Sequence, residues 1–131
     1  MIVRSVISTS VTPIILGNDR TAYRTAAHLF FKYGLISNIF AKTRTFASSF
    51  VFFAPFHPLP ASNNDCFTLM ALEKFYVEHG ESTYLLIPSD EELEGFTKRN
   101  LELLEKKFIV RTPNDITGEA AIFPLAPKKG H

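Results

Sequence analysis

The fold is decided by residues 13–34, whose sequence is PIILGNDRTAYRTAAHLFFKYG. Its first part, Pro13–Gly17, is a short β-branched run that stops at glycine, a pattern typical of a buried strand. Asn18 or Asp19 can then cap a helix from Arg20 to Tyr33, which the following glycine ends. The segment therefore predicts a strand joined by a tight turn to a helix.

The predicted helix has one apolar face and one basic face. The apolar positions repeat at spacings of one and three and are Ala22, Tyr23, Ala26, Ala27, Phe30 and Phe31. The polar positions repeat every four residues and are Arg20, Arg24, His28 and Lys32. Small side chains in the first half of the apolar face allow close approach to a sheet, so the pattern predicts a helix that packs on one.

The rest of the chain continues this alternation of strands and helices. Further strands are predicted at residues 35–40, 50–54, 83–87 and 108–110. After the strand at 50–54, Pro55, Pro58 and Pro60 are expected to forbid regular structure. Helices are predicted from the Asn63-Asn64-Asp65 cluster to His79, and from Asp90 to Lys107 with a break near Gly95. Ser89 and Glu92 match a capping box at the start of the last helix. The order favours an α/β fold, a three-layer Rossmann-like domain with an open, mostly parallel sheet of five strands.

Composition bounds what the chain can be. The chain has 131 residues, of which 46% are hydrophobic and 21% charged, so one domain with a packed core is expected. The net charge of +1 gives no electrostatic reason to bind nucleic acid or an anionic membrane. Cys66 is the only cysteine, which excludes an internal disulfide framework.

The chain is expected to divide into three parts. Residues 1–10 read as an N-terminal arm without the apolar core of a signal peptide, residues 11–112 as the folded domain, and residues 113–131 as a poorly structured tail. No apolar run approaches the roughly 20 residues needed to span a bilayer. A cytoplasmic location is therefore the expectation.

Two loops are the candidate binding elements, because ligands of such sheets bind at the carboxyl ends of the strands. They are residues 17–19, after the first strand, and residues 88–91, after the fourth. Both lie at helix starts, where anions are favoured, yet both carry carboxylates that would repel a phosphate. An amine-bearing or mixed-charge ligand suits them better than a nucleotide. The alternative, that Asp19, Ser89 and Asp90 only cap helices, stays open.

Other site types lack support in the sequence. Neither a dinucleotide-binding glycine motif nor a P-loop is present. His28, His57, His79 and His131 show no metal-ligand spacing, so no metal site is predicted. The predicted first strand ends without an acidic pair and the predicted third without an aspartate, which disfavours a phosphoacceptor receiver.

Three groups of residues resemble a known family. They are the segment from Thr12 to Asp19 followed by Thr21, Ala22, Tyr23 and Ala26; Tyr84 to Ile87 followed by a polar turn, Asn100, Leu104, Phe108 and Ile109; and Thr43-Arg44 followed by Ser48. Their order and spacing resemble, over residues 11–112, the N-terminal pre-ATP-grasp domain of the ATP-grasp carboxylate–amine ligases, the group that includes D-aspartate ligase. This sequence departs from the family pattern. Arg24 stands where the family has glycine, Ala27 where it has arginine and Glu91 where it has aspartate, and the turn after the fourth strand lacks the family's glycine.

The resemblance implies a substrate-side role in an ATP-dependent ligation. In the family, ATP phosphorylates a carboxylate, an amine attacks the acylphosphate, and an amide forms. In the family, ATP and Mg²⁺ are held by later domains, so this chain alone is expected to lack catalytic, cofactor and metal residues. It is expected to be a truncated gene product, a domain fragment, or a split subunit that works with ATP-grasp domains on another chain. The implied contacts to a small amino acid or peptide substrate are Gly17, Asn18, Asp19, Arg44, Ser89, Asp90 and Glu91.

The competing interpretation is a non-enzymatic, flavodoxin-like module that binds a small ligand or a protein partner. Exposed apolar surface would distinguish the ligase-fragment interpretation: if partner domains are missing from this chain, one helix face and the apolar patch near Phe123 should remain uncovered.

Overall fold

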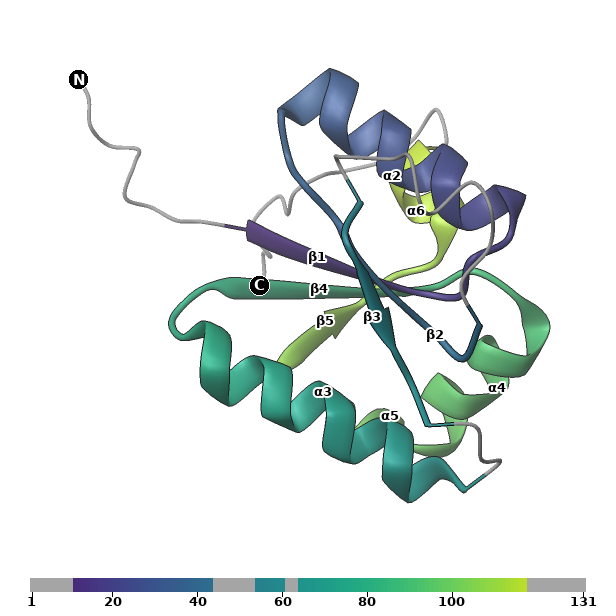
Figure 1. Ribbon diagram of the computed structural model, residues 1–131, viewed down its shortest axis with the longest axis vertical. Helices are drawn as coiled ribbons and strands as arrows, with labels where there is room; N and C mark the ends of the chain where they lie inside the picture. The colour runs from purple at the N-terminus through teal and green to yellow at the C-terminus, as the bar shows by residue number, and fades with distance from the viewer. Residues whose placement is uncertain (1–10, 44–53, 61–63, 118–131) are drawn as a thin grey trace.

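The protein is an open five-stranded parallel sheet covered by helices on both faces (Figure 1). The structure is a computed structural model that describes residues 11–43, 54–60 and 64–117. The strands are β1 (Val11–Leu16), β2 (Asn38–Ala41), β3 (Phe56–Pro58), β4 (Thr83–Pro88) and β5 (Phe108–Val110). The helices are α2 (Arg20–Tyr33), α3 (Asp65–His79), α4 (Glu91–Arg99), α5 (Leu101–Leu104) and α6 (Pro113–Thr117).

The strand order is β3-β2-β1-β4-β5, and every neighbouring pair is parallel. Such an order is Rossmann-like, and it confirms the predicted fold class. α2 and α6 cover one face of the sheet, and α3, α4 and α5 cover the other (Figure 1).

Alternating residues of the central strands fill two separate cores. Ile14 and Leu16 are buried with side chains of α3, α4 and α5, whereas Ile15 is buried with side chains of α2. β4 divides in the same way, with Leu86 in the first core and Ile87 in the second. Burial on both sides explains why these strands are continuous apolar runs rather than alternating ones.

α2 has the predicted bounds and the predicted terminators. Asp19 is its N-cap, and Gly34 ends it with a left-handed backbone at φ 72°. Ala22 and Ala26 are fully buried against the sheet, as their small size predicted. The helix could be predicted because its signals are all local in the sequence.

The edge strand β3 corrects the prediction for the proline-rich segment. Phe56–Pro58 pairs with β2, although its prolines were expected to forbid regular structure there. In the described part of the sheet β3 has β2 as its only neighbour, so one of its sides makes no ladder hydrogen bonds. Pro55 contributes only its carbonyl, which accepts from the Ile39 amide at 2.9 Å, so its missing N–H costs nothing. Of the strand predicted at 50–54, residues 50–53 lie outside the described residues.

Further boundaries differ from the sequence prediction, and β2 spans Asn38–Ala41 rather than residues 35–40. The helix expected over 90–107 divides at Asn100, not near Gly95, and the Asn100 side chain donates to the Phe96 carbonyl and to Asp65. Residues 113–117 form the short helix α6 instead of the start of a tail, because Ile116 is buried against α2. Among the described helices, none is long and apolar enough to cross a membrane.

Candidate functional site

The two candidate loops lie side by side at the edge where the parallel strands end. β1 and β4 are hydrogen-bonded neighbours, with Leu16 opposite Pro88 at their last paired position. The next residues are Gly17 and Ser89, so the loops 17–19 and 89–91 start from adjacent points of one edge. The chain leaves β1 toward α2 on one face and β4 toward α4 on the other, which is the switch point where ligands bind in such sheets. The predicted placement of both loops is confirmed.

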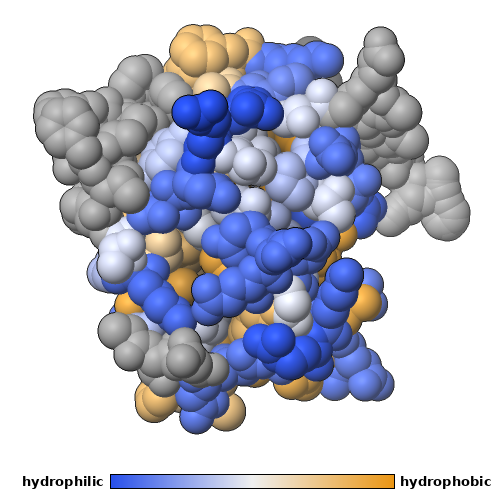
Figure 2. Space-filling view, turned by 90° about the vertical axis from the view of Figure 1, so that its right-hand side faces the viewer, coloured by the Kyte–Doolittle hydropathy of each residue, from blue (hydrophilic) through white to orange (hydrophobic). Residues whose placement is uncertain are grey.

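Most side chains on this edge are hydrophilic. Figure 2 looks onto the side of the molecule at which β1 and β4 end, and polar side chains cover most of that surface. Such a surface favours a polar or charged ligand over an apolar one.

The backbone of both loops is fixed by the neighbouring strands. The Gly17 amide donates to the Phe40 carbonyl at 2.8 Å, and the Ser89 amide donates to the Leu16 carbonyl at 2.9 Å. The side-chain amide of Asn18 donates to the Thr43 carbonyl. These two backbone N–H groups are therefore committed to the fold, and the Asn18 side chain ties the first loop to the end of β2.

Asp19 and Asp90 cap the helices that follow the loops. The Asp19 carboxylate accepts from the Ala22 amide at 3.0 Å, and the Asp90 carboxylate accepts from the Leu93 amide at 2.8 Å. Capping uses one oxygen of each carboxylate in these contacts, so the second oxygen can still meet a ligand.

Gly17 and Ser89 are in direct contact. Gly17 has φ +118°, and a Cβ added there would lie 2.1 Å from Ser89 Oγ. Ser89 is only 9% exposed, and its hydroxyl has no hydrogen-bond partner among the described residues. The resemblance predicts that Gly17 lets the backbone approach a ligand closely. In the structure, the group that approaches Gly17 closely is the Ser89 side chain.

The two remaining predicted contacts stand apart from this cluster. Glu91 is exposed in the first turn of α4. Arg44 lies outside the described residues, so the structure gives it no position.

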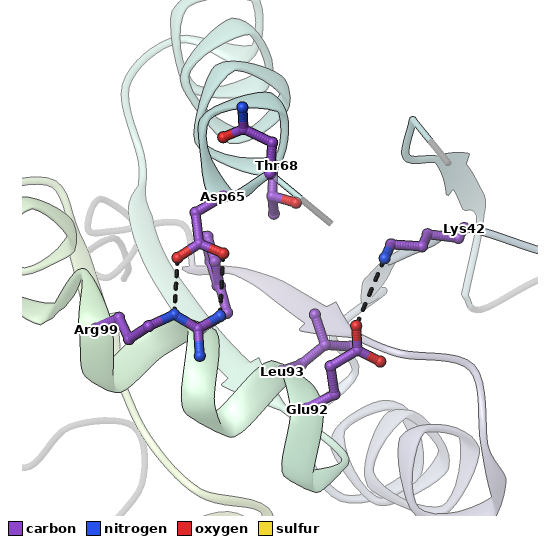
Figure 3. Close-up of a pocket in the computed structure, with 8 residues that line it drawn as sticks. Lys42, Asp65, Thr68, Glu92, Leu93 and Arg99 are labelled. Carbon is purple, nitrogen blue, oxygen red and sulfur yellow. Dashed lines mark hydrogen bonds and ion pairs between the residues drawn. The ribbon is translucent and has the colours of Figure 1, made fainter. Parts of the chain in front are cut away.

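A small cavity on the α3–α4 side is lined by two ion pairs (Figure 3). Its volume is about 40 Å³, which suits water rather than a substrate. Lys42 pairs with Glu92 at 3.5 Å, and Arg99 holds Asp65 through its Nε and Nη2 atoms at 2.9 and 3.0 Å. The hydrogen bonds from Arg99 and Asn100 lower the pKa of Asp65. All four charged side chains therefore already have partners.

A larger cavity lies between the starts of α2 and α4 and the helix α6. Its volume is about 390 Å³. Its lining residues are Thr21, Arg24, Thr25, Glu94, Thr112, Pro113, Asn114 and Thr117. Arg24 and Glu94 are its two charged residues, and neither side chain forms an ion pair or hydrogen bond with another described residue. We call this the Arg24–Glu94 cavity.

Sequence reasoning missed the Arg24–Glu94 cavity. The sequence pattern puts Arg24 on the polar face of its helix and does not by itself distinguish Glu94 from the other acidic residues around it. One signal was available, since both residues come within two turns of the start of the helices that flank the switch point. Their convergence with residues 112–117 depends on α6, which was not predicted.

The described residues form no site for a metal ion. No three His, Cys, Asp or Glu side chains among them gather closely enough to hold one.

Comparison with profiles of known protein families, with curated proteins and with solved structures finds no match for this chain.

Proposed function

We propose that this domain binds a small amine-bearing or mixed-charge ligand at the edge where β1 and β4 end, as the substrate-side domain of an ATP-dependent carboxylate–amine ligase. The observation that carries the proposal is the adjacency of the two loops, with Leu16 paired opposite Pro88 at the switch point of the sheet. An amino acid or a peptide is the ligand class that the resemblance implies.

The charges around this edge support a ligand that carries an amino group. Asp19 and Asp90 stand at the starts of α2 and α4, and the first turn of α4 adds Glu91, Glu92 and Glu94. These carboxylates offset the attraction of the helix N-termini for anions, so a phosphate group is disfavoured there. An ammonium group would be attracted by the same carboxylates.

In the proposed assembly, ATP and Mg²⁺ belong to ATP-grasp domains separate from this one. The resemblance assigns the ATP chemistry to those other domains. The role of this domain is to hold the substrate at the edge of the sheet. The reaction of the assembly would transfer the γ-phosphoryl group of ATP to a carboxylate, after which an amine displaces phosphate to form an amide.

Calorimetry on the isolated chain tests this division of roles. Mg-ATP should give no saturable heat at micromolar concentrations, whereas a zwitterionic amino acid or dipeptide should bind. Saturable Mg-ATP binding would contradict the assignment of ATP to other domains.

Asp19 allows the ligand role to be separated from capping. Asp19→Asn should retain the cap on Ala22 and weaken ligand binding by removing the negative charge, because asparagine caps helices as well as aspartate does. Asp19→Ala should weaken binding and lower the melting temperature together. Unchanged ligand affinity in Asp19→Asn would support a role in capping alone.

A second candidate function, a protein-binding module, is favoured by one observation. Met70 and Val77 of α3 are 63% and 66% exposed, and Phe67, one turn before Met70, is 43% exposed. The spacing of three and seven residues places them along one side of the helix. Among the described residues, this side of α3 is therefore an exposed apolar face, which suits contact with a protein partner in either interpretation; Phe123 lies outside the described residues.

A further inference from the structure

We infer that Arg24 and Glu94, from the helices that follow the two candidate loops, determine ligand specificity in the Arg24–Glu94 cavity, selecting a molecule that carries both a carboxylate and an ammonium group. The inference rests on the proposed function and deepens it by naming the residues that would discriminate ligands. Neither residue belongs to the two loops to which the resemblance assigns substrate contacts.

The charged side chains of the two cavities differ in whether they are paired. In the small cavity of Figure 3, every charged side chain is paired with another one. In the Arg24–Glu94 cavity, the solvent-exposed guanidinium of Arg24 and the part-exposed carboxylate of Glu94 line one space, and neither side chain is paired with the other or with another described residue. A ligand with a negative and a positive group could satisfy both of them with charge-assisted hydrogen bonds.

The wall of the Arg24–Glu94 cavity carries threonine hydroxyl groups that can both accept and donate hydrogen bonds. The hydroxyl of Thr25 is buried and donates to the Thr21 carbonyl, whereas the part-exposed hydroxyl of Thr117 donates to the Pro113 carbonyl, so the Thr117 oxygen can still accept from a ligand. The Thr112 hydroxyl oxygen accepts from the Asp115 amide, which leaves its hydrogen for donation. The wall can thus accept from an ammonium group and donate to a carboxylate.

The volume and the charges of the Arg24–Glu94 cavity both suit a small zwitterion. A volume of about 390 Å³ falls within the range of small-molecule sites, and exceeds what one or two waters need. Arg24 presents a planar fork that matches a carboxylate. Glu94 repels a second anion, so a nucleotide or an inorganic phosphate is a poorer occupant than a zwitterion.

The test is a titration of the ¹⁵N-labelled full chain, followed by amide chemical shifts. The probes are L-alanine, D-alanine and the dipeptide L-alanyl-L-alanine, with ethylamine and propionate as analogues that carry one charge each. The zwitterions should shift the amides of Arg24, Glu94, Thr112 and Thr117. Each single-charge analogue should bind at least about ten-fold more weakly, since it forfeits one charge-assisted interaction.

Variants then assign each charge to its partner. Arg24→Gln should weaken the zwitterion at least about ten-fold and leave ethylamine unchanged, whereas Glu94→Gln should weaken the zwitterion and leave propionate unchanged. Arg20→Gln on α2 and Glu102→Gln on α5 are matched controls, because both residues are exposed and neither lines the cavity. Dispersed amide spectra establish that each variant is folded.

The outcomes separate the two proposals. If zwitterions shift residues 17–19 and 89–91 and bind Arg24→Gln as tightly as the natural sequence, the specificity role is overturned and the proposed function stands. If no probe shifts any amide, both are overturned. Equal binding of zwitterions and single-charge analogues also overturns the specificity role.

Discussion

Ser89 Oγ occupies the space into which a side chain at Gly17 would project, 2.1 Å from the position of a Cβ. This contact joins the first residue after β1 to the first residue after β4, so it sets how closely the two candidate loops approach. It also explains the glycine without reference to a ligand, because both the space and the backbone angle of φ +118° exclude other residues.

Gly17→Ala should therefore destabilise the domain by about 2–5 kcal/mol, through backbone strain and overlap with Ser89. Urea denaturation of the variant measures this loss. Combining it with Ser89→Gly should restore part of the stability, because that change removes the overlapping hydroxyl and leaves only the strain. A loss that Ser89→Gly fails to reduce would show that the overlap contributes nothing.

Gly80→Ala is the matched control for the backbone component. Gly80 also has a positive φ of 96°, but an added Cβ would meet no atom within 4 Å. We expect a loss of about 1–3 kcal/mol, which is the cost of the conformation alone. Equal losses at the two glycines would contradict a specific Gly17–Ser89 contact.

Asp90→Ala should cost about 1 kcal/mol of stability, because it removes the acceptor for the Leu93 amide at the start of α4. Asp90→Asn should retain nearly all of the stability, since an asparagine oxygen can accept the same hydrogen bond. Thermal unfolding of the two variants compares them directly. Equal destabilisation by both would instead show that the negative charge matters more than the cap.

The parts of the fold that could be predicted are those whose signals lie close together in the sequence. α2 follows from its cap, its glycine stop and its periodicity. β3 could not be predicted, because it depends on tertiary pairing: only its place beside β2 makes its prolines tolerable. The same holds for the break at Asn100, whose side chain binds Asp65, 35 residues earlier in the chain.

The candidate site divides in the same way. The two loops could be located, since the carboxyl end of a strand and the start of a helix are both readable from local pattern. The Arg24–Glu94 cavity could not, because its wall comes from three segments that meet only through the burial of Ile116 against α2. A single apolar residue within a polar stretch gave too little periodicity to reveal that contact.

His57 should make the domain less stable as the pH falls below about 6.5. Its ring stacks on Phe40 at 4.6 Å and meets the edge of Phe75, and this burial lowers the pKa of His57. Well above pH 6.5, His57 is neutral in both the folded and the unfolded chain, so its titration does not lower the free energy of unfolding. As the pH falls, the unfolded chain takes up a proton that the folded state resists, and stability is lost until the folded pKa is reached.

The unfolding free energy, measured in urea at a series of pH values between 7.5 and 5, checks this expectation. His57→Gln should flatten the slope over that range, because glutamine does not titrate. It could still accept or donate at Asn38, which the His57 ring meets at 3.0 Å. An unchanged slope in His57→Gln would assign the pH dependence to other groups.

Substitutions on the exposed and the buried faces of α3 should differ in their effect on the free energy of unfolding. Met70→Lys and Val77→Lys should each change the unfolding free energy by no more than about 0.5 kcal/mol, because both side chains already lie mostly in solvent. Leu72→Ala on the buried face should cost about 2–5 kcal/mol, since Leu72 is 1% exposed within the core. Urea denaturation of the three variants gives the comparison. A large loss from either lysine would mean that another copy of the chain covers this face in solution, which dilution of the sample would then reveal as a concentration-dependent melting temperature.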